Sequence, residues 1–515
     1  MIIGLFFGTI VAYLFIGYYA SKRAKGLDDY YIAGRNAGPM FVLGTFAASW
    51  LSATGVVGYA GASYTSGIGT VIMWGGIPGF MLAVLCIVTK LYRSNSWTMF
   101  DFFANRWNDK KLAYISVFLM FFGLFPYLLS QVMGSANILA GVTGIDYKSM
   151  ILIVCVVFAA LTLSGGAWSV TVTDTSMLFI IFFAFFFLCP FVISYEGGWN
   201  AIMAGQMLTN PERFKWTGAA LTATGAISIN LIWMCGLIAG PHQGSRILIA
   251  KDERTALSGV ILANTLGTIF VWVMHTMSHG LFSHIKGIKP DQVTVTMFLS
   301  LPQEILGALG ISALFAAALS TATTMLLTLA MGVGKDVVKR LNPDLSDASM
   351  LRITKYSVVG FAVLVGLFAY FSVSAVATWG EAGSAVFACA YFPLLIFGLN
   401  WKRATREGAY AALLGGGGIF LVLWIGWKFA GWKMPFGFQP VLFGLIAGLL
   451  LMFVVSLMTK PDPKDIAFYE SLQTPPKNAF NPATDKSFRY CCAFAVIVGL
   501  LFWLAAFTIL PGPIV

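Results

Sequence analysis

The sequence predicts an all-α polytopic membrane protein with about 14 transmembrane helices, and three observations lead to this fold class. The chain is 58% hydrophobic and only 10% charged, with a mean hydropathy of +0.82, whereas soluble domains carry about 25% charged residues. Apolar stretches of about 20 residues, enough for a helix to cross a bilayer, recur along the whole chain. Basic residues gather in alternate loops between these stretches. A β-barrel would instead show short segments of alternating polarity.

The predicted spans follow one another through mostly short loops. Their approximate ranges are 1–20, 39–65, 68–89, 112–142, 149–165, 175–195, 219–243, 256–281, 303–333, 354–372, 379–399, 407–427, 437–458 and 490–509. The longest polar stretch, 459–489, is rich in proline and mixed in charge, so we expect a cytoplasmic loop there and not a folded module. The segment "SWTMFDFFANRWNDKK" at 96–111 predicts a short amphipathic helix on the inner membrane surface.

The distribution of Lys and Arg predicts the orientation. With the N-terminus outside, 25 of the 32 basic residues fall in loops on the inner side, as the positive-inside rule requires. This accounts for the net charge of +11 without a nucleic-acid partner. The first span has no basic residue before it and "SKRAK" after it, which predicts a retained helix and not a signal peptide. We expect a multi-pass protein of the plasma (inner) membrane with both termini outside.

Two of the spans are interrupted by small residues. Gly, Ser and Thr break the middle of 43–67, and Gly236, Gly240, Pro241 and Gly244 break 233–253. These are the second and the seventh span, five apart. Broken helices at matching places in two halves are typical of an inverted-repeat transporter whose binding site lies at the midplane.

A cluster of hydroxyls lies in the otherwise aliphatic segment "AALSTATTMLLTLA" at 317–330. A single Ser or Thr in a membrane helix usually bonds to its own i−4 carbonyl, and that remains the alternative for each residue here. Ser320, Thr323 and Thr324, however, share one helix face. Several oxygens that point one way, together with carbonyls of an unwound helix, predict a site for a hard cation such as Na⁺.

Asp174 is an acidic residue within an apolar span. A buried carboxylate without a partner costs several kcal/mol or more. We expect no Lys or Arg in the neighbouring spans to pair with it, so a bound cation is the predicted partner. The alternative is that Asp174 caps the start of its helix, where an acid is favourable.

Four motifs together resemble the sodium:solute symporter family. They are "FAASWLSATGVVGYAGASY", "TDTSM", "IAGPHQGSRILIAKDE" and "AALSTATT", and the resemblance covers about residues 5–460. It implies a leucine-transporter-like 5+5 inverted repeat. The expected divisions are an extra N-terminal helix and loop (1–38), the first repeat (39–195), the second repeat (196–400) and three additional C-terminal helices (401–515).

The resemblance also implies ligands for two Na⁺. The sodium site shared by the family takes carbonyls from the first core helix and a carbonyl plus two hydroxyls from the eighth. The matching positions are Ala48, Leu51, Ala317, Ser320 and Thr321. A second site, present in some members, takes an aspartate from the fifth core helix and further hydroxyls from the eighth; it would comprise Asp174, Thr323 and Thr324, with Ser320.

The solute site follows from the resemblance less clearly. The residues that face the solute would be Thr54, Gly55, Trp74, Trp233, Gly236 and Glu381. Several of these are Gly or Trp where sugar-carrying members have polar residues, which disfavours a hexose. The break resembles the pantothenate and monocarboxylate branch and implies a small organic acid, with amides after Pro241 and His242 free to meet a carboxylate.

Two of these residues have alternative roles. His242 is either part of this break or an inner-mouth histidine that bonds to backbone. Glu381 is either a solvated residue of the outer gate or the partner of an ammonium group. The latter would indicate a zwitterion such as an amino acid or betaine.

The sequence therefore predicts a Na⁺-coupled symporter that imports a small organic solute by alternating access. A sugar acid is a further alternative solute. A stand-alone sensor built like a transporter is a rival class, whereas a channel would need a continuous polar pore. No nucleophile–base pair, metal cluster or phosphate loop indicates an enzyme. The expected partners are Na⁺, the solute and the lipid bilayer, with no nucleic acid and no obligate protein partner.

Overall fold

The computed structural model describes residues 2–24, 26–68, 76–372, 375–475, 480–482 and 484–509. Over these residues it is helical, and the β-pairing there consists of one isolated bridge between Ala37 and Ala250. Ten of the described helices are long and apolar enough to cross a membrane, or eleven if one bent pair counts as a span. The predicted class, an all-helical polytopic membrane protein, is confirmed.

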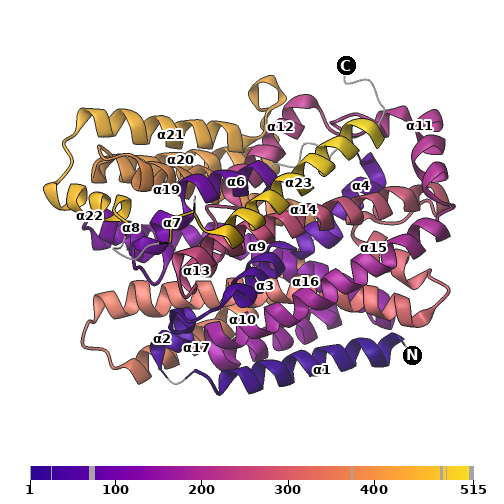
Figure 1. Cartoon of the computed structure of the whole chain (residues 1–515), viewed down its shortest axis with the longest axis horizontal. Coiled ribbons are helices and arrows are strands. Elements are labelled where there is room, and N and C mark those ends of the chain that lie inside the picture. The colour runs from indigo at the N-terminus through magenta and orange to yellow at the C-terminus, as the bar shows by residue number, and fades with distance from the viewer. Residues whose placement is uncertain are drawn as a thin grey trace.

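The helices that form the body of the protein run along its long axis (Figure 1). The helix bounds are α1 Ile2–Ser21, α2 Leu27–Ile32, α3 Pro39–Trp50, η2 Thr54–Tyr59, α4 Ala60–Ser66, α6 Gly76–Cys86, α7 Val88–Arg93, α8 Met99–Arg106, α9 Lys110–Thr143, α10 Tyr147–Tyr195, η3 Ala201–Gly205, α11 Gln206–Thr209, α12 Ala223–Leu231, η5 Ile232–Gly236, α13 Pro241–Leu248, α14 Glu253–His284, α15 Val293–Leu299, α16 Glu304–Met331, η7 Gly332–Lys339, α17 Asp347–Phe371, α18 Val376–Val386, η8 Phe387–Tyr391, α19 Phe392–Asn400, α20 Arg406–Phe429, α21 Pro440–Met458, α22 Pro463–Gln473 and α23 Lys486–Ile509.

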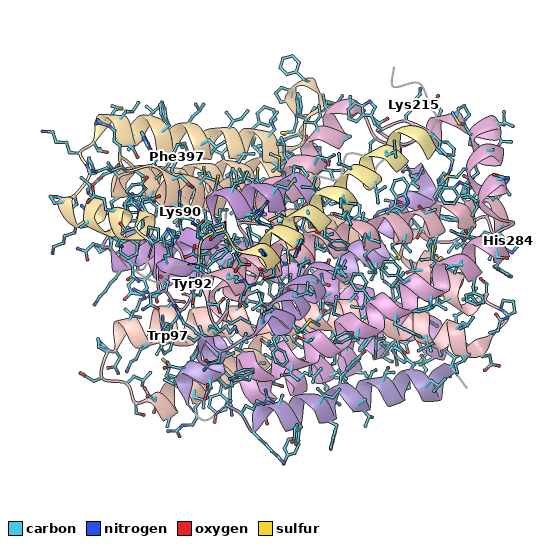
Figure 2. All side chains as sticks on the ribbon, viewed as in Figure 1. Lys90, Tyr92, Trp97, Lys215, His284 and Phe397 are labelled. Atoms are coloured by element: carbon cyan, nitrogen blue, oxygen red, sulfur yellow. The ribbon has the colours of Figure 1, made fainter. Side chains whose placement is uncertain are left out.

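The two ends of the long axis carry different loops. The short helices α2, α7, α8 and α22 gather at the left end of Figure 1, and α11 lies at the right end together with the start of α1. Lys90, Tyr92 and Trp97 lie in the left half of Figure 2, whereas Lys215 and His284 lie toward the right. The loops predicted to be cytoplasmic therefore lie together.

Helix α10 has 49 residues and would be about 73 Å long if straight, more than twice the ~30 Å hydrocarbon core. Two glycines inside it are not helical: Gly165 (φ −158°, ψ 20°) and Gly166 (φ 57°, ψ −137°). A Cβ on Gly166 would lie 2.3 Å from the carbonyl oxygen of Tyr30, so only glycine fits. The break falls between the predicted spans 149–165 and 175–195.

Both interrupted spans contain a helix break. Helix α3 ends at Trp50, and the chain bends by 49° before the helical segment Thr54–Ser66. In the other span, η5 ends at Gly236 and α13 starts at Pro241, after Gly240 with an extended backbone (ψ 126°). Between these breaks runs α16, whose residues from Gly310 to Met331 are all buried. Its hydroxyl cluster therefore faces protein on every side.

Two predicted segments pack against the rest of the protein. The amphipathic helix predicted at 96–111 forms as α8, whose Arg106 is fully buried and donates to the carbonyls of Gly398 (2.7 Å) and Asp465 (3.0 Å). The predicted loop at 459–489 contains the short helix α22, which starts with Pro463 and is held by the bond to Asp465 and by the buried Leu472.

Candidate sodium and solute sites

Four of the five residues predicted for the first sodium site lie together where α3 ends. The Ser320 hydroxyl is 2.8 Å from the Ala48 carbonyl oxygen and 3.1 Å from that of Ala317. The Thr321 hydroxyl is 3.1 Å from the carbonyl oxygens of Ala317 and Ser49. The fifth residue, Leu51, lies at the break itself, where its ψ of 64° ends the helix.

The break explains why these oxygens are available. A carbonyl in the last turn of a helix has no N–H partner further along the chain, so α3 presents carbonyls to α16 at this place. The ligand set has only neutral oxygens, and each hydroxyl can rotate from donating a hydrogen bond to presenting a lone pair. This set suits a monovalent hard cation, because it contains no carboxylate whose negative charge would favour a divalent ion.

The sequence missed two participants at this site. The Ser49 carbonyl accepts from Thr321 and also from the side-chain amide of Gln243, which lies 3.4 Å away on α13. Gln243 is buried, and its own Oε1 has no hydrogen-bond partner among the described residues. Its position two residues after Pro241 is a signal in the sequence that could have identified it, because α13 begins at Pro241 and runs within the core.

Asp174 has a protein cation as its partner. Arg246 Nη2 is 3.2 Å from Asp174 Oδ2, and the exposed fractions of the two side chains are 2% and 0%. Thr45 donates to the same oxygen at 2.6 Å, and Arg246 also donates to the Thr324 hydroxyl. The expectation that no Lys or Arg lies nearby is therefore wrong. Arg246 was assigned to an inner loop, but α13 carries it into the core.

The other residues expected at the second sodium site have different partners. Thr324 lies 3.5 Å from Asp174 Oδ2, whereas the described hydrogen bonds of Thr323 go to the carbonyls of Leu319 and Ser320 in its own helix. Ser320 belongs to the first cluster. Asp174 lies well inside α10, seven residues after the helix resumes at Ala167, so it is not the cap of a helix start.

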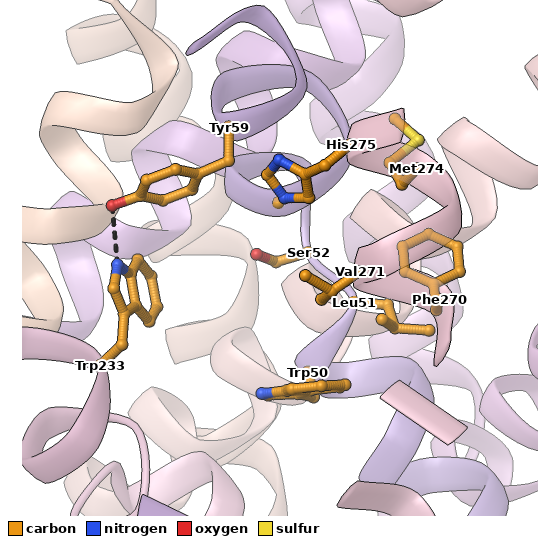
Figure 3. A pocket seen from close by; sticks show the side chains of 10 residues that line it. Trp50, Leu51, Ser52, Tyr59, Trp233, Phe270, Val271, Met274 and His275 are labelled. Atoms are coloured by element: carbon orange, nitrogen blue, oxygen red, sulfur yellow. Dashed lines mark hydrogen bonds between the residues drawn. The ribbon is translucent and has the colours of Figure 1, made fainter. Parts of the chain in front are cut away.

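A small cavity lies beside the first sodium site (Figure 3). Its volume is about 40 Å³, and its lining consists of Trp50, Leu51, Ser52, Gly55, Tyr59, Trp233, Phe270, Val271, Met274 and His275. A water molecule takes about 30 Å³ in the liquid, so the cavity as it stands has room for about one water molecule. The residues from α14, Phe270 to His275, were not among the predicted contacts.

A chain of hydrogen bonds runs from the cavity wall to Glu381. The indole N–H of Trp233 donates to the Tyr59 hydroxyl at 2.7 Å, and that hydroxyl donates to Glu381 Oε1 at 2.5 Å. The rings of Tyr59 and Trp233 meet edge to face, with their centroids 5.6 Å apart. Glu381 is thus half-buried and held behind the aromatic wall, not freely solvated.

Some of the remaining predicted solute contacts line the cavity, and others do not. Gly55 and Trp233 line the cavity. Thr54 instead pairs with the Ser130 hydroxyl at 2.9 Å, and Gly236 allows close helix packing, because a Cβ there would lie 2.0 Å from the Ser384 carbonyl oxygen. Trp74 lies outside the described residues.

The Pro241–His242 break does not reach the cavity lining. His242 is fully buried between the rings of Tyr127 and Phe387, at centroid distances of 5.6 and 6.2 Å. Neither of its ring nitrogens has a hydrogen-bond partner in the described part of the chain, so its side chain does not bond to backbone there. The amides of Gln243 and Gly244 already donate to the Gly240 carbonyl.

Comparisons with known proteins identify the family. The model of the sodium:solute symporter family matches residues 30–416, about three quarters of the chain. The chain belongs to the sodium:solute symporter family. This symporter is similar to the sodium/proline symporter of Staphylococcus aureus, with 26% identity over 489 residues that cover 88% of this chain and 92% of the relative. The branch of the family that was expected, pantothenate- and monocarboxylate-like, is not what this relative represents.

Solved structures share the fold. A substrate-bound, outward-open Na⁺-coupled sialic acid symporter superposes with a TM-score of 0.75 at 18% identity, covering 89% of this chain and 98% of that one. A nucleobase-cation-symport-1 family transporter in a closed conformation with bromovinylhydantoin bound has a TM-score of 0.50 at 14% identity, covering 86% and 98%. The protein is a Na⁺-coupled solute symporter of the membrane and not an enzyme.

Proposed function

We propose that this symporter imports a small zwitterion, such as an amino acid or betaine, together with Na⁺ bound at the cluster of Ala48, Ser320 and Thr321. The observation that carries the choice of solute is the position of Glu381. Its carboxylate is fixed by the Tyr59 hydroxyl directly behind the aromatic wall of the central cavity. A solute that enters beside Tyr59 therefore meets a negative charge.

The lining of the cavity supports a cationic group on the solute. Trp50, Tyr59, Trp233 and Phe270 supply aromatic surfaces, which attract ammonium groups through their negative ring faces. None of the described lining residues is Lys or Arg, so a simple organic anion would find no fixed positive charge there. The carboxylate of a zwitterion can lie at the break in α3, next to the bound Na⁺. The named activity of the sodium/proline symporter agrees with this solute class.

A simple organic acid remains the second candidate because of His242. Its imidazole is buried with both nitrogens unpartnered in the described structure, and buried polar groups without partners are uncommon. A carboxylate that reached the Pro241–His242 break would supply a partner. This solute would have to bind outside the cavity, because His242 is not among the lining residues.

We further infer the architecture of a leucine-transporter-like transporter with fourteen spans. In this arrangement α3–α10 and α12–α19 are the two repeats, α1 precedes them, and α20, α21 and α23 follow. The support is the break in the second and the seventh span and the division of α10 at Gly165 and Gly166. The gathering of most basic residues in alternate loops supports an orientation with both termini outside the plasma membrane, and the repeat supports alternating access.

Uptake into proteoliposomes tests the proposal. A thermal-shift screen of amino acids, betaines, organic acids and sugars, with and without Na⁺, first selects the solutes that stabilise the purified protein. Uptake of each selected solute is then measured with an imposed Na⁺ gradient and, as a control, with K⁺ in place of Na⁺. Accumulation of a zwitterion that requires Na⁺ supports the proposal, whereas accumulation of simple carboxylates alone contradicts it.

A further inference from the structure

The Asp174–Arg246 pair lies where the resemblance implies a second Na⁺. Asp174 supplies one negative charge, and Arg246 balances it with its guanidinium group 3.2 Å away. A buried carboxylate in a membrane protein needs one positive charge close by. That requirement is already met by the chain itself, so a Na⁺ added here would leave an excess charge in a buried site.

Several of the oxygens that a second Na⁺ would need are already bonded, although Asp174 Oδ1 has no hydrogen-bond partner among the described residues. Asp174 Oδ2 accepts from Thr45 and pairs with Arg246, and the Thr324 hydroxyl accepts from Arg246. Guanidinium and Na⁺ would therefore compete for the same ligands. Thr323, the other hydroxyl expected at this site, donates to carbonyls of its own helix and has no hydrogen bond to Asp174 among the described contacts.

We propose that Arg246 is a tethered cation that fills the second cation site, so that this symporter carries one Na⁺ per solute and not two. The inference rests on Na⁺-coupled symport but not on which solute is carried. Arg246 is then a specificity-determining residue: its charge sets the number of ions that move in each cycle. The two-ion set that the resemblance implies does not fit a site in which the chain supplies the cation.

The place of Arg246 in the fold strengthens this assignment. The residue lies on α13, the helix that follows the break at Gly240, and it bonds to Asp174 on α10 and to Thr324 on α16. Thr45 on α3 donates to the same Asp174 oxygen. The cluster therefore joins the two interrupted spans to the two helices that surround them. Thr324 also donates to the Ser320 carbonyl at 3.0 Å, one turn along α16. Thr324, which accepts from the guanidinium, thus lies one helical turn along α16 from Ser320 of the first cluster.

The main experiment counts ions in proteoliposomes, as the ratio of tracer Na⁺ flux to solute flux. This ratio does not depend on the charge of the solute. We expect one Na⁺ per solute in the wild type, and the same ratio in Arg246→Lys, which keeps a positive charge. In Arg246→Gln the carboxylate loses its partner, and we expect Na⁺ to take the place of the guanidinium and the ratio to rise to two. The double variant Asp174→Asn/Arg246→Gln should return to one.

A wild-type ratio of two would overturn the proposal, and so would an Arg246→Gln variant that transports with an unchanged ratio of one. If Arg246→Gln does not fold, the ratios of the wild type and of Arg246→Lys still decide the question. A Na⁺ titration of thermal stability gives a second readout without any solute, with a Hill coefficient of about 1 expected in the wild type and about 2 in Arg246→Gln. Failure to find a transported zwitterion would leave this titration intact, so the two proposals fail separately.

Adjacent threonines provide a matched control in the Arg246→Gln background. Thr324→Ala removes an oxygen beside Asp174 and should weaken the second Na⁺. Thr323→Ala removes a hydroxyl that bonds only within its helix among the described contacts, and it should leave the second ion unchanged. The reverse order of effects would return Thr323 to the ligand set and contradict the geometry on which the proposal rests.

Discussion

Replacing Glu381 with glutamine changes the charge beside the solute cavity while it keeps the size of the side chain. The Tyr59 hydroxyl, now 2.5 Å from Glu381 Oε1, can still donate to the amide oxygen, so the aromatic wall should stay in place. A solute with an ammonium group would lose a charge-assisted contact of roughly 1.5–3 kcal/mol, which corresponds to a loss of about ten-fold to over one hundred-fold in affinity.

The assay compares the concentration of solute that gives half-maximal Na⁺-driven uptake in the wild type and in Glu381→Gln. The apparent affinity for Na⁺ serves as an internal control, because the sodium cluster contains no atom of Glu381 and should respond little. Tyr59→Phe is the matched variant: it removes the hydroxyl that positions the carboxylate but keeps the charge, so we expect a smaller loss. If Glu381→Gln leaves the affinity unchanged or improves it, the solute carries no ammonium group near this residue and the zwitterion proposal is wrong.

Three other substitutions test separate parts of the structure. Ser320→Ala should raise the Na⁺ concentration needed for half-maximal uptake, because it removes a ligand oxygen, whereas Thr328→Ala, whose hydroxyl bonds to its own helix, should leave that concentration unchanged. Burial raises the pKa of Glu196, at the end of α10, to about 9. The folded state therefore keeps a proton that the unfolded state loses above about pH 4.5, and the stability of the protein should fall as pH rises from about 4.5 to 9. The melting temperature of Glu196→Gln should lack this dependence on pH. Gly236→Ala should lower the melting temperature and uptake, because its Cβ would collide with a backbone oxygen, whereas Gly418→Ala meets no atom within 4 Å and should behave as wild type.

The class of the fold and the place of the first sodium cluster follow from short-range patterns in the sequence. Hydropathy defines spans because a bilayer demands about 20 apolar residues, and helical periodicity puts Ser320 and Thr321 near Ala317. The carbonyl oxygens that α3 contributes could be assigned only through the resemblance to the family, because every residue has a backbone carbonyl and the sequence does not mark which ones bind. Leu51 shows the limit of that approach: its place at the break is right, but the Ser49 carbonyl, two residues earlier, is the one that bonds to Thr321.

Arg246 shows why the second site could not be predicted. Counting basic residues assigns it to an inner loop, since it follows Gly240 and Pro241 and precedes Lys251 and Arg254. Only the direction of α13 after the break decides whether its side chain faces cytoplasm or core. The same three-dimensional information separates Thr323 from Thr324, which differ by one position in the sequence but bond to different partners.

The small cavity and the ion pairs of Asp101 are two features of this conformation that α16 connects. A cavity of about 40 Å³ has no room for an amino acid, so the wall formed by Tyr59 and Trp233 must move before a solute enters. At the inner end, Asp101 on α8 pairs with Lys335 at 2.8 Å and with Arg340 at 2.5 Å, which ties α8 to the segment that follows α16. Because these side chains are largely buried, separating them exposes charges that water must then solvate. Helix α16 connects the two places, since it carries Ser320 and Thr321 at its centre and leads directly into η7, which contains Lys335.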